Sequence, residues 1–144
     1  MNDPLERLLE QKTGGLETVG PETSIMDAVA RMNQRSIGSV LVMEGERLVG
    51  IFTERDVLTR VVPRQLDPNK TPVREVMTRQ LVTVSPSTTV QEAMVVVTDT
   101  RHRHLPVVQG GRVMALVSTG DLTRWVVRDQ QRTIDGLVDY VRRG

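Results

Sequence analysis

The chain of 144 residues is long enough for one compact domain with a sizeable core, and short for two independent ones. Acidic and basic residues are interspersed and leave a net charge of +1, so its charge indicates neither a nucleic acid nor a membrane as the partner. It contains no cysteine, which excludes disulfides, thiolate metal sites and a cysteine nucleophile.

The first residues predict a short helix over residues 1–12. Asp3, Pro4 and Glu6 fit an N-cap, a first-turn proline and an acid in the first turn, and Gly14 with Gly15 would end the helix. This start carries acid where a targeting peptide carries a basic flank, and no apolar run approaches the ~20 residues that cross a bilayer. We therefore expect a cytoplasmic protein.

The sequence then repeats itself at a constant offset of 65 residues. Residues 18–62 align with residues 83–127 without a gap, and 11 of the 45 aligned positions are identical. An internal repeat of this kind indicates two copies of one supersecondary unit, each of which needs the other to bury an apolar face.

The first repeat predicts the order β-α-β-β-α. Residues 16–19 form a strand, Ser24 begins a helix through a capping box with Asp27, and residues 39–43 and 47–52 form a hairpin. The second repeat has an equivalent strand, an equivalent box and an equivalent hairpin (Thr89 with Glu92; 105–108 and 112–117). We therefore expect an α/β fold in which two repeats pack with pseudo-twofold symmetry.

The last predicted helix continues well past its counterpart in the first repeat. One apolar stripe follows it, made of Leu122, Trp125, Val126, Ile134, Leu137, Val138 and Val141. This stripe either lies between the subunits of a homodimer or folds back on the chain's own core.

Turn signals over residues 63–72 predict a linker between the repeats. The predicted organisation is an N-terminal helix over 1–12, a first repeat over 13–66, a second repeat over 72–130 and a helical extension over 131–144.

A hydroxyl residue stands three positions before an aspartate at the start of the last helix of each repeat. These are Thr53 before Asp56 and Ser118 before Asp121. One such pair is explained as a capping box that satisfies free backbone donors. Its recurrence favours a second role, because a carboxylate there can also accept charge-assisted hydrogen bonds from the vicinal hydroxyls of a ribose.

Three further motifs give the chain a family resemblance. They are Gly50-Ile51-Phe52-Thr53-Glu54-Arg55-Asp56, Val76-Met77-Thr78 and Arg103-His104-Leu105-Pro106-Val107-Val108. In combination they resemble the tandem cystathionine β-synthase (CBS) domain pair, or Bateman module, of bacterial stand-alone proteins, and the resemblance covers nearly the whole chain.

This resemblance implies a regulatory module that senses an adenosine-containing ligand: AMP, ADP, ATP, NAD or S-adenosylmethionine. The ligand would lie in clefts that combine elements of both repeats. By position, one cleft would use Thr53, Arg55, Asp56, Thr83, Val84, His102, Arg103 and His104. The other would use Thr18, Val19, Ile37, Ser39, Ser118 and Asp121. The resemblance also implies a homodimer that acts on a regulated protein partner, and it does not choose among the ligands.

The two clefts differ in their expected phosphate contacts. Arginines and histidines gather around the first cleft (Arg55, Arg101, His102, Arg103 and His104), so we expect tighter phosphate binding there. In the second repeat, Ala115 stands where the first repeat has Gly50, and a methyl group there obstructs a close backbone approach.

Other classes of function have less support. His102 and His104 share one face of a strand, but the chain has only these two histidines and no cysteine, so we expect no metal site. No nucleotide-hydrolase loop or catalytic triad pattern is present, so we expect no enzyme. Three aromatic residues are too few for single-stranded nucleic acid. A protein-interaction module with degenerate ligand sites remains the alternative.

Overall fold

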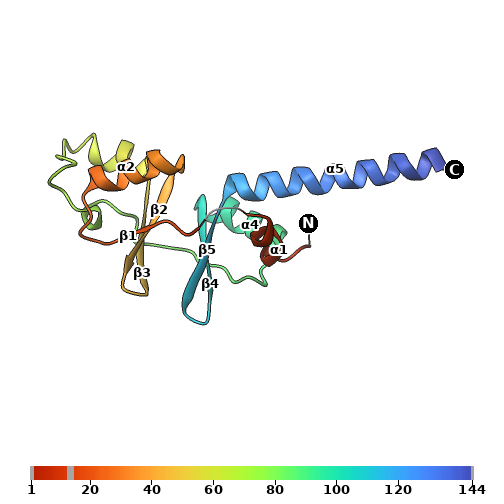
Figure 1. The fold of residues 1–144 in the computed structure, drawn as a ribbon, viewed down its shortest axis with the longest axis horizontal. Helices are drawn as coiled ribbons and strands as arrows, with labels where there is room; N and C mark the ends of the chain where they lie inside the picture. Colours follow the sequence, from red (N-terminus) through yellow and green to blue (C-terminus); the bar gives the residue numbers. More distant parts are fainter. Residues whose placement is uncertain (1, 13–14, 144) are drawn as a thin grey trace. The chain divides into compact units, whose positions relative to one another are not determined.

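The computed structural model describes residues 2–12 and 15–143, which fall into two compact units (Figure 1). The first unit comprises residues 15–81. The second unit joins the described residues before 13 to the residues from 82 on. Each unit has its own hydrophobic core.

The first unit contains a three-stranded sheet in the order β1-β2-β3. Strand β1 (Thr18–Val19) runs parallel to β2 (Ser39–Glu44), and β2 forms an antiparallel hairpin with β3 (Arg47–Thr53). Helix α2 (Ile25–Arg35) begins at Ser24, whose hydroxyl accepts a hydrogen bond from the Asp27 amide at 3.1 Å. The predicted cap, helix and hairpin are confirmed, and the first strand is shorter than predicted.

After β3 the chain turns directly into helix. The short α3 (Glu54–Asp56) continues into the π-helical η1 (Val57–Val61), and a 3-10 turn, η2 (Val73–Glu75), follows after a loop. Phe52 lies fully buried in the core of this unit. The other buried core residues are Val19, Ile25, Ala28, Met32, Val40, Val42, Val61, Val73, Val76 and Met77.

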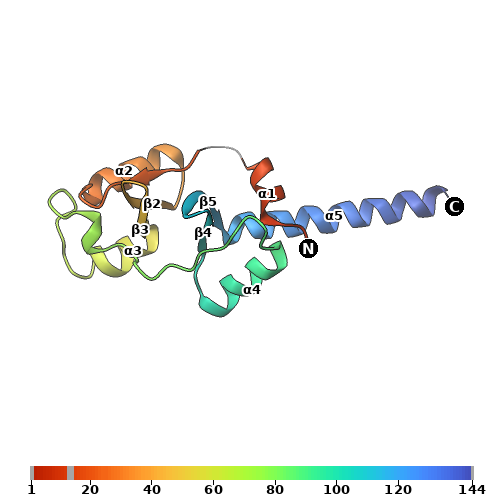
Figure 2. The ribbon, with the colours of Figure 1, turned by 90° about the horizontal axis from the view of Figure 1, so that it is seen from below.

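The second unit packs three helices with one hairpin (Figure 2). Its elements are α1 (Leu5–Gln11), α4 (Val90–Thr100), β4 (His104–Gln109), β5 (Arg112–Ser118) and α5 (Thr119–Arg143). The predicted first strand of this repeat is reduced to a single parallel bridge between Val84 and Val107. Helices α2 and α4 end alike, since Ser36 and Arg101 both adopt left-handed backbone angles (φ 53° and 60°).

The start of α1 differs from the prediction. Pro4 is the N-cap and Asp3 is not, so that part of the prediction is wrong, although Glu6 does lie in the first turn. The Asp3 carboxylate instead accepts hydrogen bonds from Arg7 at 3.2 Å and from the Trp125 indole at 3.3 Å. Helix α1 ends at Gln11 with Lys12 as its C-cap; of the predicted stop, Gly14 lies outside the described residues.

Each repeat is covered by the segment that precedes the other repeat in the chain. The amide of Leu5 donates to Thr88 O at 2.8 Å and that of Glu6 to Pro86 O at 3.1 Å. In the first unit, the amides of Val73 and Arg74 donate to Thr23 O and Pro21 O at the same two distances. The acceptors are 65 residues apart, whereas the donors are 68 apart.

Helix α5 confirms the predicted long C-terminal helix. Its first turns are anchored in the second core by Leu122 and Trp125, which are buried. Arg132 lies over the Trp125 ring with its guanidinium carbon 5.8 Å from the ring centroid. From residue 130 to residue 142 every side chain is exposed.

Candidate functional site

The two hydroxyl and aspartate pairs form the same hydrogen-bonded box at the end of β3 and of β5. In the first unit, the Thr53 amide donates to Asp56 Oδ2 at 2.9 Å and the Asp56 amide donates to Thr53 Oγ1 at 3.2 Å. In the second unit, the corresponding bonds of Ser118 and Asp121 measure 2.8 and 3.1 Å. The structural role predicted for these residues is therefore confirmed in both copies.

Asp56 is buried, with only 4% of its surface exposed, and its second oxygen has partners of its own. Thr78 Oγ1 donates to Asp56 Oδ1 at 3.1 Å, and Arg60 Nε lies 3.9 Å from the same oxygen. A carboxylate has about four acceptor positions, and two are filled by these hydrogen bonds. Asp56 therefore retains acceptor capacity.

Gly50 allows Thr78 to lie beside Asp56. Backbone hydrogen bonds join Ile51 to Thr78 in both directions, at 3.0 and 2.8 Å. A Cβ on Gly50 would lie 2.6 Å from Met77 Sδ and 3.0 Å from Thr78 O, which is too close for either contact. The glycine expected from the sequence to permit a close approach does so here, and the approaching chain is residues 77–78.

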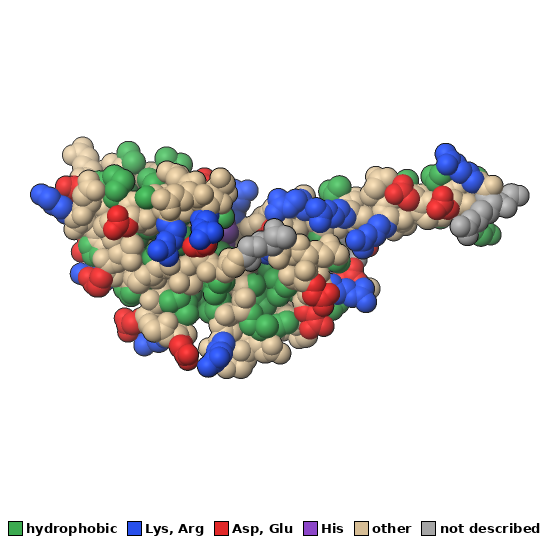
Figure 3. Space-filling view, in the orientation of Figure 1, with side chains coloured by type: hydrophobic (Ala, Val, Ile, Leu, Met, Phe, Trp, Pro, Cys, Tyr) green, Lys and Arg blue, Asp and Glu red, His purple; other side chains and the backbone are tan. Residues whose placement is uncertain are grey.

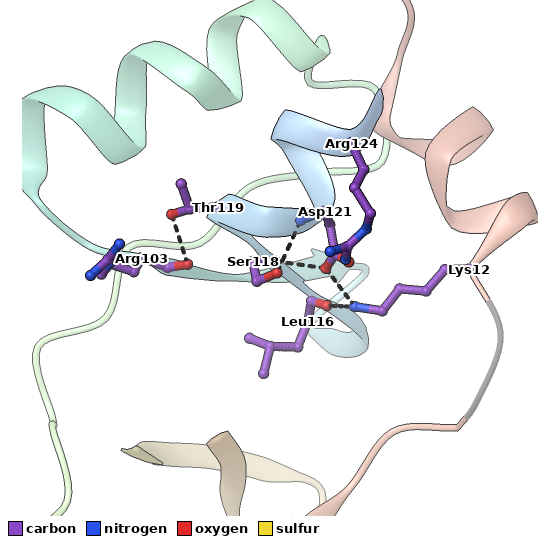
Figure 4. A network of polar contacts seen from close by, with 7 residues as sticks. All are labelled: Lys12, Arg103, Leu116, Ser118, Thr119, Asp121 and Arg124. Carbon is purple, nitrogen blue, oxygen red and sulfur yellow. Dashed lines mark hydrogen bonds and ion pairs between the residues drawn. The ribbon is translucent and has the colours of Figure 1, made fainter. Parts of the chain in front are cut away.

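Asp121 is held by two cations (Figure 4). Lys12 Nζ lies 2.8 Å from Asp121 Oδ2 and also donates to Leu116 O, and Arg124 Nη2 lies 2.6 Å from Asp121 Oδ1. Lys12 comes from the C-terminal end of α1, and its role at Asp121 resembles that of Thr78 at Asp56. The second repeat thus replaces a neutral donor with a charged one.

These contacts set the protonation state of Asp121. Burial alone raises the pKa of the Asp121 carboxyl, and it is the largest single influence. Hydrogen bonds from Lys12 and Ser118, together with the positive charge of Lys12, outweigh it. The net result is a pKa below the ordinary value, so Asp121 is ionised at neutral pH.

We expect Lys12→Met to raise the pKa of Asp121. Because this pKa is lower in the folded than in the unfolded protein, ionised Asp121 stabilises the fold above the unfolded pKa of about 3.9, and this contribution is lost as the pH falls through the folded value. The variant should therefore lose less stability on acidification than the parent does. Carboxyl NMR titration and thermal unfolding between pH 7 and pH 2 measure both effects.

Lys70→Met is the matched control, since Lys70 is exposed and its side chain has no hydrogen bond or ion pair with another described residue. An unchanged Asp121 titration in Lys12→Met would show that Lys12 does not hold this carboxylate in solution.

The remaining site residues predicted in the first repeat lie in two places. Ser39 is buried and pairs with Thr53 across the hairpin, with Ile37 two residues before it. Arg55 is exposed on α3. Thr18 and Val19 instead line a hollow of about 640 Å³ together with Asp27, Met43 and other residues, and neither Ile37 nor Ser39 lines that hollow.

The site residues predicted in the second repeat gather near Ser118. His104 pairs with Ser118 between β4 and β5, and Arg103 O accepts hydrogen bonds from the amide and the hydroxyl of Thr119, at 2.9 and 3.2 Å (Figure 4). Val84 is buried and Thr83 is exposed, and His102 follows the end of α4. The pairing of these residues with Asp56, and of Thr18 with Asp121, stays a prediction.

Lys12, Arg60 and Thr78 contact the two aspartates and were not among the predicted site residues. A signal for Thr78 was present, because it belongs to the motif Val76-Met77-Thr78. Lys12 has no such signal, since it lies 109 residues before Asp121.

Among the described residues, no three His, Asp or Glu side chains are placed to hold a metal ion. No described helix is long and apolar enough to cross a membrane.

Comparison with known proteins gives consistent matches. The model of the CBS domain family matches residues 12–63 and 73–128. The mitochondrial CBS domain-containing protein CBSX3 of Arabidopsis thaliana is 35% identical over 128 residues, which are 85% of this chain and 62% of that protein. The chain thus spans less than two thirds of this relative.

Two solved structures share both sequence and fold with the chain. A crystal structure of a CBS domain is 38% identical, covers 87% of this chain and 98% of its own, and has a TM-score of 0.82. A protein with CBS domains from Burkholderia ambifaria is 34% identical, covers 89% and 96% of the two chains, and has a TM-score of 0.83.

Proposed function

Because the chain belongs to the CBS domain family, as the resemblance predicted, we propose that it is a regulatory module that binds an adenosine-containing ligand at Asp56 and Asp121. AMP, ADP, ATP and NAD are the ligand class. The observation that supports this proposal is the duplicated box, in which a carboxylate is fixed beside a hydroxyl by the same pair of hydrogen bonds in each unit.

The chemistry of the box suits a ribose. Each aspartate is held by backbone donors, so its orientation is set before a ligand arrives, and vicinal hydroxyls can donate to the remaining acceptor positions. At Asp121 those positions are shared with Lys12 and Arg124, which a ligand would have to displace or contact. We therefore expect weaker ribose binding at Asp121 than at Asp56.

The ligand would act by shifting a conformational equilibrium, and only as far as it prefers one state over the other. No catalytic step belongs to this proposal. The regulated protein and the cytoplasmic location stay predictions.

Thermal unfolding with adenosine ligands at about 1 mM, and with guanosine controls, tests the proposal. A ligand with a Kd of about 10 μM would stabilise the protein by about 2.7 kcal/mol and raise its Tm by several degrees. Asp56→Asn should lose most of this shift, because the amide replaces an acceptor oxygen with a donor.

Asp99→Asn is the control, since Asp99 is exposed and its side chain has no described partner. A parent protein that shows no shift with any adenosine compound would favour the alternative, a protein-interaction module. An equal shift in Asp56→Asn would return Asp56 to a capping role alone.

We also propose a homodimer, formed through the exposed half of α5. Val127, Ile134 and Val141 fall at heptad position a, and Gln130 and Leu137 at position d. All charged residues from 127 to 143 fall at positions b, c and f: Arg128, Asp129, Arg132, Asp135, Asp139, Arg142 and Arg143. Charged side chains follow this part of the helix (Figure 3), and the seam opposite them is uncharged.

A second copy of the chain fits this seam. Leu137 and Val141 are 61% and 73% exposed, so the seam is uncovered by the chain's own core. β-Branched residues at a with leucine at d favour two parallel helices. The open alternative, a stripe that folds back on the core, is wrong for the distal half of the stripe, because its members Ile134, Leu137, Val138 and Val141 are all exposed.

A further inference from the structure

Four arginines line one hollow on the first unit, on the side of Asp56 where Thr78 lies. The hollow has a volume of about 690 Å³. Its lining residues are Arg60, Arg64, Arg74, Glu75, Met77, Thr78, Arg79 and Gln80. All of them belong to residues 15–81, so the hollow is complete within one unit.

Backbone carbonyls hold two of these arginines in place. Arg60 Nη1 donates to Val76 O at 3.1 Å and to Met77 O at 2.9 Å. Arg79 Nη2 donates to Arg74 O at 3.0 Å. A guanidinium has five N–H donors, so each of these side chains is fixed by part of its donors and keeps others available.

The positive charge of the hollow exceeds what its acidic residues balance. Among the lining residues, four arginines face one acid, Glu75, which lies 4.0 Å from Arg74. Arg74 also pairs with Glu22 at 2.7 Å. The Arg64 side chain has no hydrogen bond or ion pair with any described residue. Fixed like charges around one hollow repel each other unless an anion binds between them.

From these observations we propose that the arginine hollow binds a chain of phosphate groups. Guanidinium groups match phosphate oxygens with paired hydrogen bonds, and several arginines suit a ligand with several charges. The volume suits a small molecule. The lining contains no aromatic residue on which a nucleic-acid base could stack, so the hollow fits an oligophosphate better than a nucleic acid.

The hollow adjoins the proposed ribose site. Thr78 lines the hollow and donates to Asp56 Oδ1, and Arg60 lines it and lies 3.9 Å from the same oxygen. The oligophosphate is therefore either inorganic or part of a nucleoside triphosphate whose ribose lies at Asp56. The second case rests on the proposed function, and it makes ATP a better ligand than AMP.

Calorimetric titration with inorganic tripolyphosphate, ATP and AMP at about 150 mM salt tests the proposal. We expect tripolyphosphate to bind the parent protein, and we expect the double variant Arg64→Ala with Arg79→Ala to bind it about tenfold more weakly or worse. Both arginines are exposed, so the variant should fold. Arg128→Ala with Arg142→Ala removes the same charge from α5 and should bind tripolyphosphate as the parent does.

Asp56→Asn separates this proposal from the function proposed above. Undiminished tripolyphosphate binding in this variant with weakened ATP binding supports both. Tripolyphosphate binding that depends on Arg64 and Arg79, with ATP affinity unchanged in Asp56→Asn, supports the hollow and contradicts the ribose site. No binding of tripolyphosphate at 1 mM, or equal binding in both double variants, overturns the hollow.

Discussion

Leu5→Ala is expected to destabilise the second unit by about 2–5 kcal/mol, although Leu5 lies far from that repeat in the chain. Leu5 is fully buried in a core with Leu105, Val107 and Leu122, and alanine would leave a cavity there. Hydrogen exchange followed by mass spectrometry should show faster exchange in β4 and β5 and little change in β2 and β3, and denaturant unfolding gives the free energy.

Leu16→Ala is the matched control, because Leu16 is 38% exposed and the same methyl groups are removed near the same end of the chain. Its free energy of unfolding should change by less than about 1 kcal/mol. If Leu5→Ala accelerated exchange in β2 and β3 as much as in β4 and β5, Leu5 would not belong to the second core alone.

Ile134→Asp is expected to turn the proposed dimer into a monomer. It would place an unpaired carboxylate at a central a position, and an uncompensated charge in a dry seam costs about 3–5 kcal/mol, or at least about a hundredfold in affinity. Light scattering should report twice 16.1 kDa for the parent and 16.1 kDa for the variant. Asp135→Asn, on the charged face, should leave the mass at the dimer value.

The direction of the two helices has its own measurement. The chain has no cysteine, so Val141→Cys introduces a single thiol at position a. In a parallel dimer the two copies of residue 141 face each other at a separation that a disulfide can bridge. Mild oxidation should therefore cross-link Val141→Cys and not Arg142→Cys. A monomeric parent would contradict the proposed seam altogether.

The elements that the sequence predicted best are those coded by neighbouring residues. Ser24 and Thr89 begin helices, the two hairpins have their predicted ranges within one or two residues, and both hydroxyl and aspartate pairs form their boxes. Each of these depends on contacts within a few positions, which a local pattern reports directly.

The contacts between distant segments were not predictable in the same way. The repeat alignment has one constant offset of 65, whereas the covering segments match at 68, as Asp3-Pro4-Leu5 against Thr71-Pro72-Val73 shows. The arginine hollow joins residues 60 and 79, which share no periodic pattern. A sequence pattern identifies an apolar face and does not say which segment covers it.

The exchange of covering segments has a consequence for the order in which the protein is made. The first unit is one continuous stretch, so it can fold once residue 81 has left the ribosome. Helix α1 is synthesised before it, yet Leu5 and Leu8 are buried only when α4, β4, β5 and the start of α5 exist. The earliest part of the chain is therefore among the last to find its place, and its apolar side chains stay exposed to water, or to a chaperone, throughout the synthesis of the unit in between.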